Sequence, residues 1–570
     1  MRAVEIDHQF QRLKSKLEAY SQRLISVLAS SIWTERGPIR LARFHHQLEL
    51  ETEMVLTDEQ AYAVDLFKSS SSLKISAFAG TGKTSTLTAV AGSTRRHGLY
   101  LAFNKSIASE AATKFPRSVD CRTTHSIAFR AVPSQYKGND SKLTQSLYAN
   151  RVAQLLNLEE LVVGNIILKP RNLGYLIAKT VQNFCQSGWD EITPNMVPMY
   201  GKLKDLDNTF KWEFSVYLSK MASHLWDIML DPSSDAPLGH DGYLKLWSLS
   251  RPCLNYDYIL LDEAQDTNGA VLSVLRDQDA HLTLVGDRHQ QIYEWRGAVN
   301  AMASMETDAE AALTRSFRFG DAIAEAANSV LMVLGEERHV LGNARRDTKI
   351  AGEGQTDAIL CRTNAGVVTM VIDALNRHRM PYVVGGVMEL IKMLEDVTKL
   401  KLGLPAASPD FFGFKDWNDV VEFSTTEEGQ SLRSFVKLVQ ERGEQNLIDK
   451  LKLISTEESS ADLIISTGHK AKGREWDSVT LHTDFEPRLN KETPPRTVMN
   501  GEEARLLYVA ITRARQLLVV PPLLAQKWNA PVVATQEVQP PQAHTIHQPV
   551  RVAARPDLPA FAKPVREQLR

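Results

Sequence analysis

Cysteine is scarce in this sequence. The chain has four cysteines, Cys121, Cys185, Cys253 and Cys361, and no two of them form a C-x-x-C pair. This spacing argues against a zinc site, an iron–sulfur cluster and a disulfide framework. We therefore expect reduced thiols.

The sequence also lacks long hydrophobic runs and an excess of charge of either sign. No apolar run approaches the roughly 18 residues that span a membrane, and the first residues lack the apolar core of a signal peptide, so we expect no membrane contact. Because the formal net charge is only -2, any nucleic acid must bind a local groove rather than a globally basic body.

The chain is long enough for several domains. It has 570 residues, of which 43% are apolar. At about 150 residues per domain, three or four folded units are expected.

The most informative stretch is Ile75-Ser-Ala-Phe-Ala-Gly-Thr-Gly-Lys-Thr84, an apolar strand followed by a glycine-rich turn and the start of a helix. Gly80 and Gly82 permit backbone angles that let successive N–H groups surround a phosphate, and the helix that follows presents its positive end. Lys83 suits the β- and γ-phosphates and Thr84 suits a magnesium ion. The pattern predicts that ATP and Mg²⁺ bind through Ala79, Gly80, Thr81, Gly82, Lys83, Thr84 and Ser85.

One position of this stretch departs from the usual phosphate-loop pattern, because Ala77 stands where a glycine is usual. The alternative is an ordinary turn with a surface lysine.

Upstream, Gln60 has two interpretations. It completes a helix-capping box with Thr57, or its amide donates to and accepts from adenine.

Two carboxylates follow a buried strand at Tyr258-Ile-Leu-Leu-Asp-Glu263. An Asp–Glu pair alone is usually a solvated strand end. After a phosphate loop it predicts that Asp262, with Thr84, holds magnesium and that Glu263 activates water.

A further strand, Leu282 to Asp287, leads into Gln290-Gln-Ile-Tyr-Glu-Trp-Arg-Gly297. Gln290 is placed to sense the γ-phosphate. Tyr293 and Trp295 offer stacking faces to bases, each stack worth roughly 1–3 kcal/mol. The alternative is an aromatic core cluster.

The second half repeats the α/β pattern without a second phosphate loop, so we expect it to supply groups to the one nucleotide site. Arg318 and Arg513 are the candidates, because guanidinium groups suit a γ-phosphate. The alternative for each is a surface salt bridge. Between them, the basic stretch 467–476 suits backbone phosphates, with Glu475 able to hold a ribose.

Two further segments end where parallel strands end, which is where α/β folds bind ligands. They are Leu99 to Lys105, with Phe103 and Asn104, and the segment around His125. Phe103 and His125 are alternatively core residues.

In this order the motifs resemble those of superfamily 1 helicases of the UvrD/Rep type. They are Gln60, the loop ending at Thr84, Ala-Phe-Asn-Lys105, Thr-Thr-His125, Leu-Leu-Asp-Glu-Ala-Gln-Asp266, the segment from Val285 to Ala298, Phe-Arg318, the stretch 467–476 and Tyr-Val-Ala-Ile-Thr-Arg-Ala514. Details such as Tyr243-Leu-Lys-Leu-Trp247 are most similar to the F-box DNA helicase branch and its bacterial relatives. Residues 1–50 show no recognisable F-box.

The resemblance implies an α/β protein with two RecA-like P-loop domains of parallel strands, plus inserted helical subdomains. The domains expected are an N-terminal helical extension (1–50), a first RecA-like domain (51–132 and 251–305) with a helical insertion (133–250), a second RecA-like domain (306–402 and 459–525) with a small helical insertion (403–458), and a disordered proline-rich tail (526–570).

The resemblance also implies ATP between the domains, Arg318 and Arg513 completing the site, and single-stranded DNA across the top. The residues it assigns to DNA are Phe103, Asn104, His125, Tyr293, Trp295, Arg296, Thr467 and His469. DNA junctions and a protein bound by the tail are further expected partners. The expected location is cytoplasmic in a bacterial or phage-like source, or nuclear in a eukaryote.

The expected function is ATP-dependent 3′-to-5′ translocation on single-stranded DNA, or helicase activity, in DNA repair or recombination control. One alternative is a motor that strips recombinase from DNA with little unwinding. Another is an ATP-gated DNA clamp that does not move.

Overall fold

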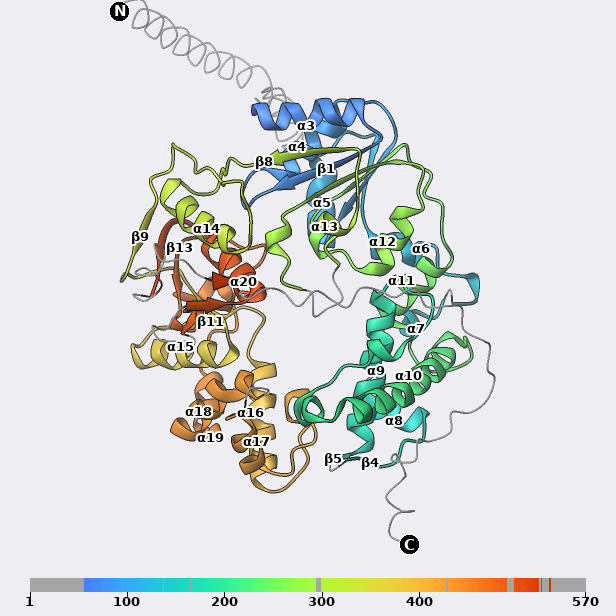
Figure 1. The fold of residues 1–570 in the computed structure, drawn as a ribbon, viewed down its shortest axis with the longest axis vertical. Helices are drawn as coiled ribbons and strands as arrows, with labels where there is room; N and C mark the ends of the chain where they lie inside the picture. The colour runs from blue at the N-terminus through green and yellow to red at the C-terminus, as the bar shows by residue number, and fades with distance from the viewer. Residues whose placement is uncertain are drawn as a thin grey trace, which may run out of the picture. The chain divides into compact units, whose positions relative to one another are not determined.

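The computed structural model describes residues 56–521 except 137, 165, 294–298, 427–428 and 490–496, and beyond these only Leu524, Val533 and Ala534. The predicted N-terminal extension, residues 1–50, lies outside the described residues. The elements below belong to the unit Asp58–Arg570 and are labelled in Figure 1. Among the described helices, none combines the length and the apolar character needed to cross a membrane.

The first sheet has six parallel strands in the order β3-β2-β6-β7-β1-β8. Its middle strands are almost continuously apolar because helices cover both faces of a parallel sheet; all of β6 is buried. The strands are β1 (Ser72–Ala77), β2 (Gly98–Ala102), β3 (Val119–Thr123), β6 (Tyr258–Leu261), β7 (His281–Gly286) and β8 (Ala309–Leu313), and the helices are α3 (Asp58–Ser69), α4 (Lys83–Gly92), α5 (Lys105–Lys114), α6 (Thr124–Arg130), α12 (Gly269–Arg276) and α13 (Ala301–Ser304).

Strand β8 corrects the predicted domain boundary at residues 305 and 306. Residues 309–313 were assigned to the second domain, but they pair in parallel with β1 at the edge of the first sheet. The sequence of β8, Ala-Glu-Ala-Ala-Leu, has no strong strand signal, because alanine and glutamate are depleted in strands. The strand forms because the neighbouring β1 provides a partner.

The described part of the first insertion contains five α-helices and a hairpin. The hairpin, β4 (Leu161–Val163) and β5 (Ile166–Leu168), was not expected in a segment predicted to be helical. One apolar core runs from the first sheet into the insertion and includes Leu99, Leu176 and Leu218. The helices are α7 (Asp140–Thr144), α8 (Ala149–Leu155), α9 (Pro170–Gln186), α10 (Asn208–Leu230) and α11 (Gly239–Leu249).

The second sheet is also six-stranded and parallel, in the order β11-β12-β10-β13-β16-β9. Two parallel α/β sheets confirm the predicted fold class. The strands are β9 (Lys349–Ala351), β10 (Ala358–Cys361), β11 (Pro381–Val383), β12 (Leu463–Thr467), β13 (Trp476–Leu481) and β16 (Ala514–Val519), and the helices are α14 (Asp321–Val333), α15 (Asn364–Asn376), α16 (Met388–Lys401) and α20 (Gly501–Ile511).

A small third sheet lies beside this domain and includes two residues of the predicted disordered tail. It consists of β14 (Arg488–Leu489), β15 (Thr497–Met499) and β17 (Val533–Ala534), in the order β14-β15-β17. Strand β17 pairs in parallel with β15, and disorder of residues 526–570 stays a prediction. The remainder of 526–570 lies outside the described residues.

The second insertion contains the short helices α17 (Trp417–Phe423), α18 (Arg433–Arg442) and α19 (Glu444–Leu451). It contacts the first insertion, as Figure 1 shows for the loops near α17 and α10. The side chain of Phe412 is 1% exposed and belongs to the core of the first insertion. The N–H of Lys202 donates to the Phe412 carbonyl over 3.2 Å, and the Lys202 ammonium contacts Asp419 at 2.6 Å.

A glycine makes this joint between the insertions possible. Gly201 has φ +52°, and a Cβ there would lie 2.4 Å from the Phe412 carbonyl oxygen. Only glycine combines this left-handed backbone with so close an approach. The ring of Tyr175 also packs against Phe412 in a T-shaped contact, with ring centroids 5.3 Å apart.

Candidate nucleotide and DNA site

The predicted phosphate loop lies between β1 and α4. Gly80 and Gly82 have φ +75° and +80°, the left-handed conformations that the glycines were expected to supply. A Cβ on Gly80 would lie 2.6 Å from the Cβ of Arg318. The N–H of Phe317 donates to the Gly80 carbonyl over 2.7 Å. The segment that carries Arg318 therefore packs directly against the phosphate loop.

Lys83 and Glu263 form an ion pair, with 2.8 Å between Nζ and Oε1. Burial lowers the pKa of Lys83, but the carboxylates of Glu263 and Asp262 outweigh it and the pKa is raised. Burial also raises the pKa of Glu263, but the ammonium groups of Lys83 and Lys472 outweigh it and the pKa is lowered. Both groups are therefore charged at neutral pH. Glu263 has φ 50°, a strained backbone for a residue with a side chain.

Asp262 accepts a hydrogen bond from the hydroxyl of Tyr100 over 2.7 Å. Burial and the neighbouring Glu263 carboxylate raise the pKa of Asp262, so the charge of a cation here would stabilise its ionised form. Thr84 stands in the first turn of α4. A carboxylate and a hydroxyl are oxygen donors, the type that Mg²⁺ prefers, so the residues present fit that ion. Among the described residues, no three His, Cys, Asp or Glu side chains form a metal site by themselves.

Asp287 and Gln290 form the centre of a buried hydrogen-bond network. The amide of Gln290 donates to Asp287 over 2.8 Å, and the Tyr508 hydroxyl donates to the same carboxylate oxygen over 2.9 Å. The backbone N–H of Asp287 donates to Gln265 over 3.1 Å, and Gln265 donates to Glu263 over 2.6 Å. The residue predicted to sense the γ-phosphate is therefore connected to the predicted general base.

Arg513 and Arg318 approach this network from the second domain. Arg513 is 2% exposed, which rules out the surface salt bridge considered for it, and its Nη2 donates to the Oε1 of Gln290 over 3.2 Å. Burial and the nearby Arg318 lower the pKa of Arg513 to about 9, and the guanidinium remains charged at neutral pH. Arg318 donates from Nε to Glu475 over 2.6 Å and from Nη1 to the Thr512 carbonyl over 3.1 Å.

Two further residues predicted to bind nucleotide have partners within the protein. Glu475 accepts the hydrogen bond from Arg318 just described, and its role at a ribose stays a prediction. Gln60 is buried and donates from its amide to Thr86 on α4 over 3.1 Å. It therefore lies against the phosphate-loop helix, and adenine binding by Gln60 is also still a prediction.

The first domain presents three of the predicted DNA residues at strand ends. Phe103 follows β2 and is 56% exposed, so the core alternative for Phe103 is wrong. Asn104 caps α5 by accepting from the N–H of Ile107 over 2.9 Å. His125 lies in the first turn of α6 and is partly exposed, 3.9 Å from Asp241 on α11.

Of the remaining predicted DNA residues, Tyr293 and His469 lie where the two domains meet. The Tyr293 hydroxyl donates to the His469 carbonyl over 2.9 Å, and the Lys472 ammonium lies 5.3 Å from the centre of the Tyr293 ring. Thr467 ends β12 and is buried. Trp295 and Arg296, for which stacking or DNA contact was predicted, lie outside the described residues.

Sequence reasoning did not single out Lys472 and Tyr508. Lys472 forms an ion pair with Asp266 and donates to the backbone carbonyl of Gln290. Both residues stand inside the stretches that drew attention to Glu475 and Arg513. A buried tyrosine within a helix gives no sequence pattern of its own. The available signal for Tyr508 was therefore its position near Arg513 in the sequence.

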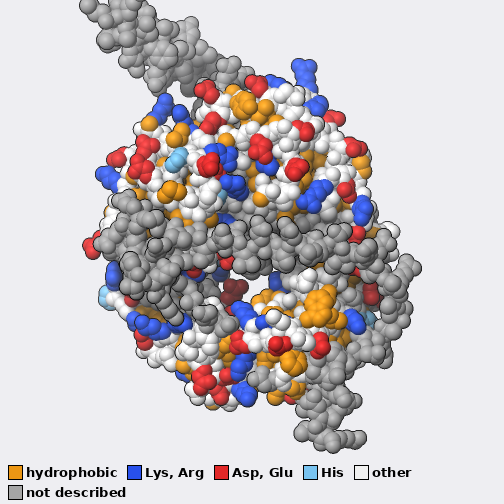
Figure 2. All heavy atoms as spheres, in the orientation of Figure 1, with side chains coloured by type: hydrophobic (Ala, Val, Ile, Leu, Met, Phe, Trp, Pro, Cys, Tyr) orange, Lys and Arg blue, Asp and Glu red, His pale blue; other side chains and the backbone are white. Residues whose placement is uncertain are grey.

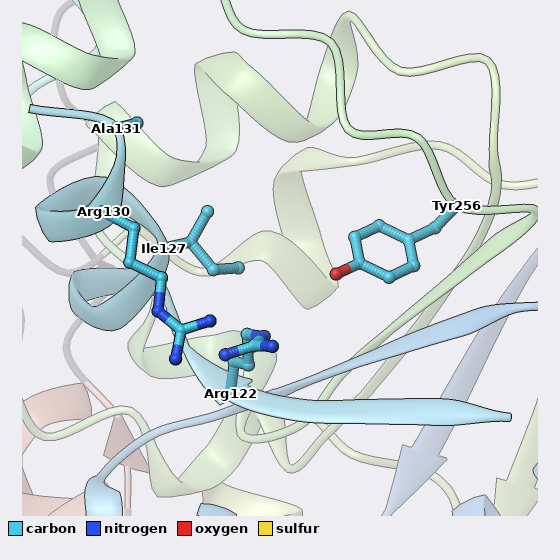
Figure 3. A pocket seen from close by; sticks show the side chains of 5 residues that line it. All are labelled: Arg122, Ile127, Arg130, Ala131 and Tyr256. Atoms are coloured by element: carbon cyan, nitrogen blue, oxygen red, sulfur yellow. The ribbon is translucent and has the colours of Figure 1, made fainter. Parts of the chain in front are cut away.

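A shallow hollow of about 310 Å³ lies beside the edge strand β3. Figure 3 shows the Arg122 and Arg130 side chains on one side and the ring of Tyr256 on the other. Asp120 pairs with Arg122 at 3.4 Å and accepts from the Tyr256 hydroxyl over 2.9 Å. Figure 2 shows positive and negative side chains interspersed over one face of the molecule.

Comparisons with known proteins agree with this geometry. Residues 248–309 match the model of the UvrD/REP helicase N-terminal domain, and residues 417–522 match the UvrD-like helicase C-terminal domain. F-box DNA helicase 1 of Gallus gallus is 31% identical over 88% of this chain and 52% of its own length. F-box DNA helicase protein 1 of Schizosaccharomyces pombe is 30% identical over 82% of this chain and 57% of its own length.

A shorter similarity links the chain to a bacterial protein. ATP-dependent DNA helicase PcrA of Leuconostoc citreum is 36% identical over 15% of this chain and 12% of its own length. This chain spans about half the length of the two F-box relatives. Both sets of residues that build the nucleotide site, around Glu263 and Gln290 and around Glu475 and Arg513, fall in the matched segments. The chain therefore contains segments that match the N- and C-terminal domains of the UvrD-like helicases.

Proposed function

We propose that the protein is an ATP-driven motor that moves 3′ to 5′ on single-stranded DNA and unwinds duplexes at junctions. The main support is the hydrogen bond between Arg513 and Gln290, at 3.2 Å. It joins a cationic group of the second domain to Gln290, the residue of the first domain that is predicted to sense the γ-phosphate. A site assembled from two domains changes whenever the domains move apart, so hydrolysis at such a site alternates between a closed and an open form.

Each residue has a defined task in this proposal. Lys83 exchanges its contact with Glu263 for the β- and γ-phosphates, which frees the Glu263 carboxylate to accept a proton from the attacking water. Gln290 orients the reacting groups. Arg318 and Arg513 stabilise the negative charge that develops on the transferred phosphoryl group. Thr84 and Asp262 would hold Mg²⁺, which would neutralise phosphate charge.

DNA binding uses groups at the strand ends and the domain junction. Phe103 is exposed and available for stacking on bases, which tolerates any sequence. Tyr293 connects the bound DNA to the second domain through its hydrogen bond to the His469 carbonyl. The likeness to relatives named as F-box DNA helicases supports helicase activity, and DNA repair or recombination control is the setting that we propose.

The test is ATP hydrolysis on oligothymidylates of increasing length. A translocating motor resets less often on a longer strand, so turnover rises with length and reaches a plateau. Glu263→Gln should bind ATP and DNA but show no turnover at any length. Turnover that is independent of strand length in the wild-type protein would contradict translocation.

The joint between the insertions favours a second candidate, an ATP-gated clamp. Phe412 and Lys202 connect the insertions of the two domains, so contacts join the two halves of the chain at two separate places. A clamp would retain circular single-stranded DNA longer than a linear strand of equal length. It would hydrolyse ATP at the same rate on short and long strands, which distinguishes it from the motor in the same assay.

A further inference from the structure

Tyr508 is a buried tyrosine that connects the two domains at the phosphate loop. It lies on α20 of the second domain and is 0% exposed. Its hydroxyl accepts a hydrogen bond from the backbone N–H of Ala79 over 3.2 Å and donates to Asp287 over 2.9 Å. One oxygen atom therefore links the phosphate loop to the segment that carries Gln290.

The packing around Tyr508 shows that the loop is held by the second domain. Phe78 and Ala79, which begin the loop, belong to the apolar core of that domain together with Tyr508. Burial and the Asp287 carboxylate raise the pKa of Tyr508, so the phenol keeps its proton and remains a donor to Asp287 at neutral pH.

The last turn of α20 and the residues just after it contact both members of the Asp287–Gln290 pair. Tyr508 bonds Asp287, and Arg513, five residues further on, bonds Gln290 over 3.2 Å. The backbone carbonyl of Gln290 accepts from Lys472, three residues after His469. Gln290 thus stands between the phosphate loop and the predicted DNA residues, and Tyr508 fixes the carboxylate that orients it.

We infer that Tyr508 is a positioning residue that couples DNA binding to ATP hydrolysis, by keeping Gln290 aligned with the phosphate loop. This inference rests on the proposed function. When DNA shifts the segment that carries Tyr293 and His469, the shift reaches the nucleotide through Gln290 and Asp287. Without the hydroxyl, Gln290 loses its alignment, and DNA no longer accelerates the reaction fully.

The test compares Tyr508→Phe with wild type, by phosphate release with and without saturating oligothymidylate. The variant keeps the ring and loses the hydroxyl. We expect DNA-stimulated kcat to fall about tenfold, the typical effect of losing one hydrogen bond to a charged group. KM for ATP and Kd for DNA should stay within twofold. A loss in kcat below threefold, or an equal rise in KM, would overturn the inference.

Tyr258→Phe is the matched control. Tyr258 is also buried, in β6, and its hydroxyl has no hydrogen-bond partner among the described residues. Its removal should leave DNA-stimulated kcat unchanged. A second variant, Asp287→Asn, keeps the inference falsifiable if Tyr508→Phe folds poorly. Tyr508 and Asp287 act through one contact. The double variant, Tyr508→Phe with Asp287→Asn, should therefore lose no more DNA-stimulated kcat than Asp287→Asn alone. Losses in kcat that multiply would show independent roles.

Amide hydrogen exchange at Ala79 separates the inference from the proposed function. The Ala79 N–H donates to Tyr508, so its exchange should accelerate at least tenfold in Tyr508→Phe, whether or not the protein is a motor. If DNA did not stimulate ATP hydrolysis by the wild-type protein, the proposed function would be wrong, and the coupling role with it. Unchanged exchange at Ala79 would overturn the Tyr508 contact alone.

Discussion

Two of the places where the described halves of this protein meet differ in chemistry. At the nucleotide site, polar bonds join the halves, from Arg513 to Gln290 and from Tyr508 to Asp287, beside the apolar packing of Phe78 and Ala79. At the joint between the insertions, Phe412 is buried in the core of the first insertion, with one ion pair beside it. Buried polar contacts depend strongly on exact geometry and on charge, whereas apolar burial depends mainly on area.

This difference suggests a division of labour. A network of charged groups changes when phosphate charges enter or leave, so the nucleotide site suits a contact that opens and closes with each cycle. The Phe412 contact has no group that responds to nucleotide, so it should persist through the cycle. Variants at each place should therefore affect different properties: turnover at the first, and stability of the joint at the second.

The largest expected effect is that of Arg513→Ala on hydrolysis. Arginine groups that stabilise the transition state of phosphoryl transfer contribute roughly 10³–10⁵ in rate, so kcat should fall by about that factor. Exchange at the Lys202 amide, in the distant joint, should not change. Steady-state phosphate release checks the rate. An effect below tenfold would assign Arg513 a structural role instead.

Glu263→Gln and Lys83→Ala should separate chemistry from binding. Loss of a general base lowers the rate roughly 10²–10⁴-fold, and Glu263→Gln should still bind a fluorescent ATP analogue. Lys83→Ala should lose hydrolysis and bind the analogue more weakly, since it removes a phosphate ligand. Normal turnover in Glu263→Gln would contradict its assignment as the base.

The polar site could be predicted from the sequence better than the joint could. Lys83, Glu263, Gln290 and Arg513 stand in short patterns because the chemistry requires particular residue types next to strand ends. The structure brings all four into one connected network. The partners of each were not predictable, since contacts such as Arg513 with Gln290 depend on how the two domains meet.

The fold shows the same limit. Apolar runs such as β6 predict buried strands, because a strand covered on both faces must be apolar throughout. Strand β8 has no such run and was assigned to the wrong domain. Phe412 stands next to Phe411 in the sequence, yet Phe411 lies in the core of the second insertion and Phe412 in that of the first. No local pattern distinguishes two such neighbours.

These two phenylalanines provide a matched test of the joint. Phe→Ala changes in a core cost roughly 3–5 kcal/mol. In Phe412→Ala this cost should fall on the joint, so the Lys202 amide, which donates to the Phe412 carbonyl, should exchange much faster. Phe411→Ala should instead destabilise the second insertion, with faster exchange in α17 and α18. Basal ATP hydrolysis should stay within twofold in Phe412→Ala. A tenfold loss would show that the two contact regions are not separable.

The smallest expected effect is that of the ion pair beside Phe412. Lys202 and Asp419 are partly exposed, with 24% and 18% of their side chains accessible, and solvent weakens such pairs to about 0.5–1 kcal/mol. Lys202→Met keeps the aliphatic part of the side chain and removes the charge. Exchange at the residue 202 amide should therefore rise only a few-fold, and the increase should shrink in 1 M salt, where the wild-type pair is screened. An effect as large as that of Phe412→Ala would mean that charge, rather than the buried ring, holds the insertions together.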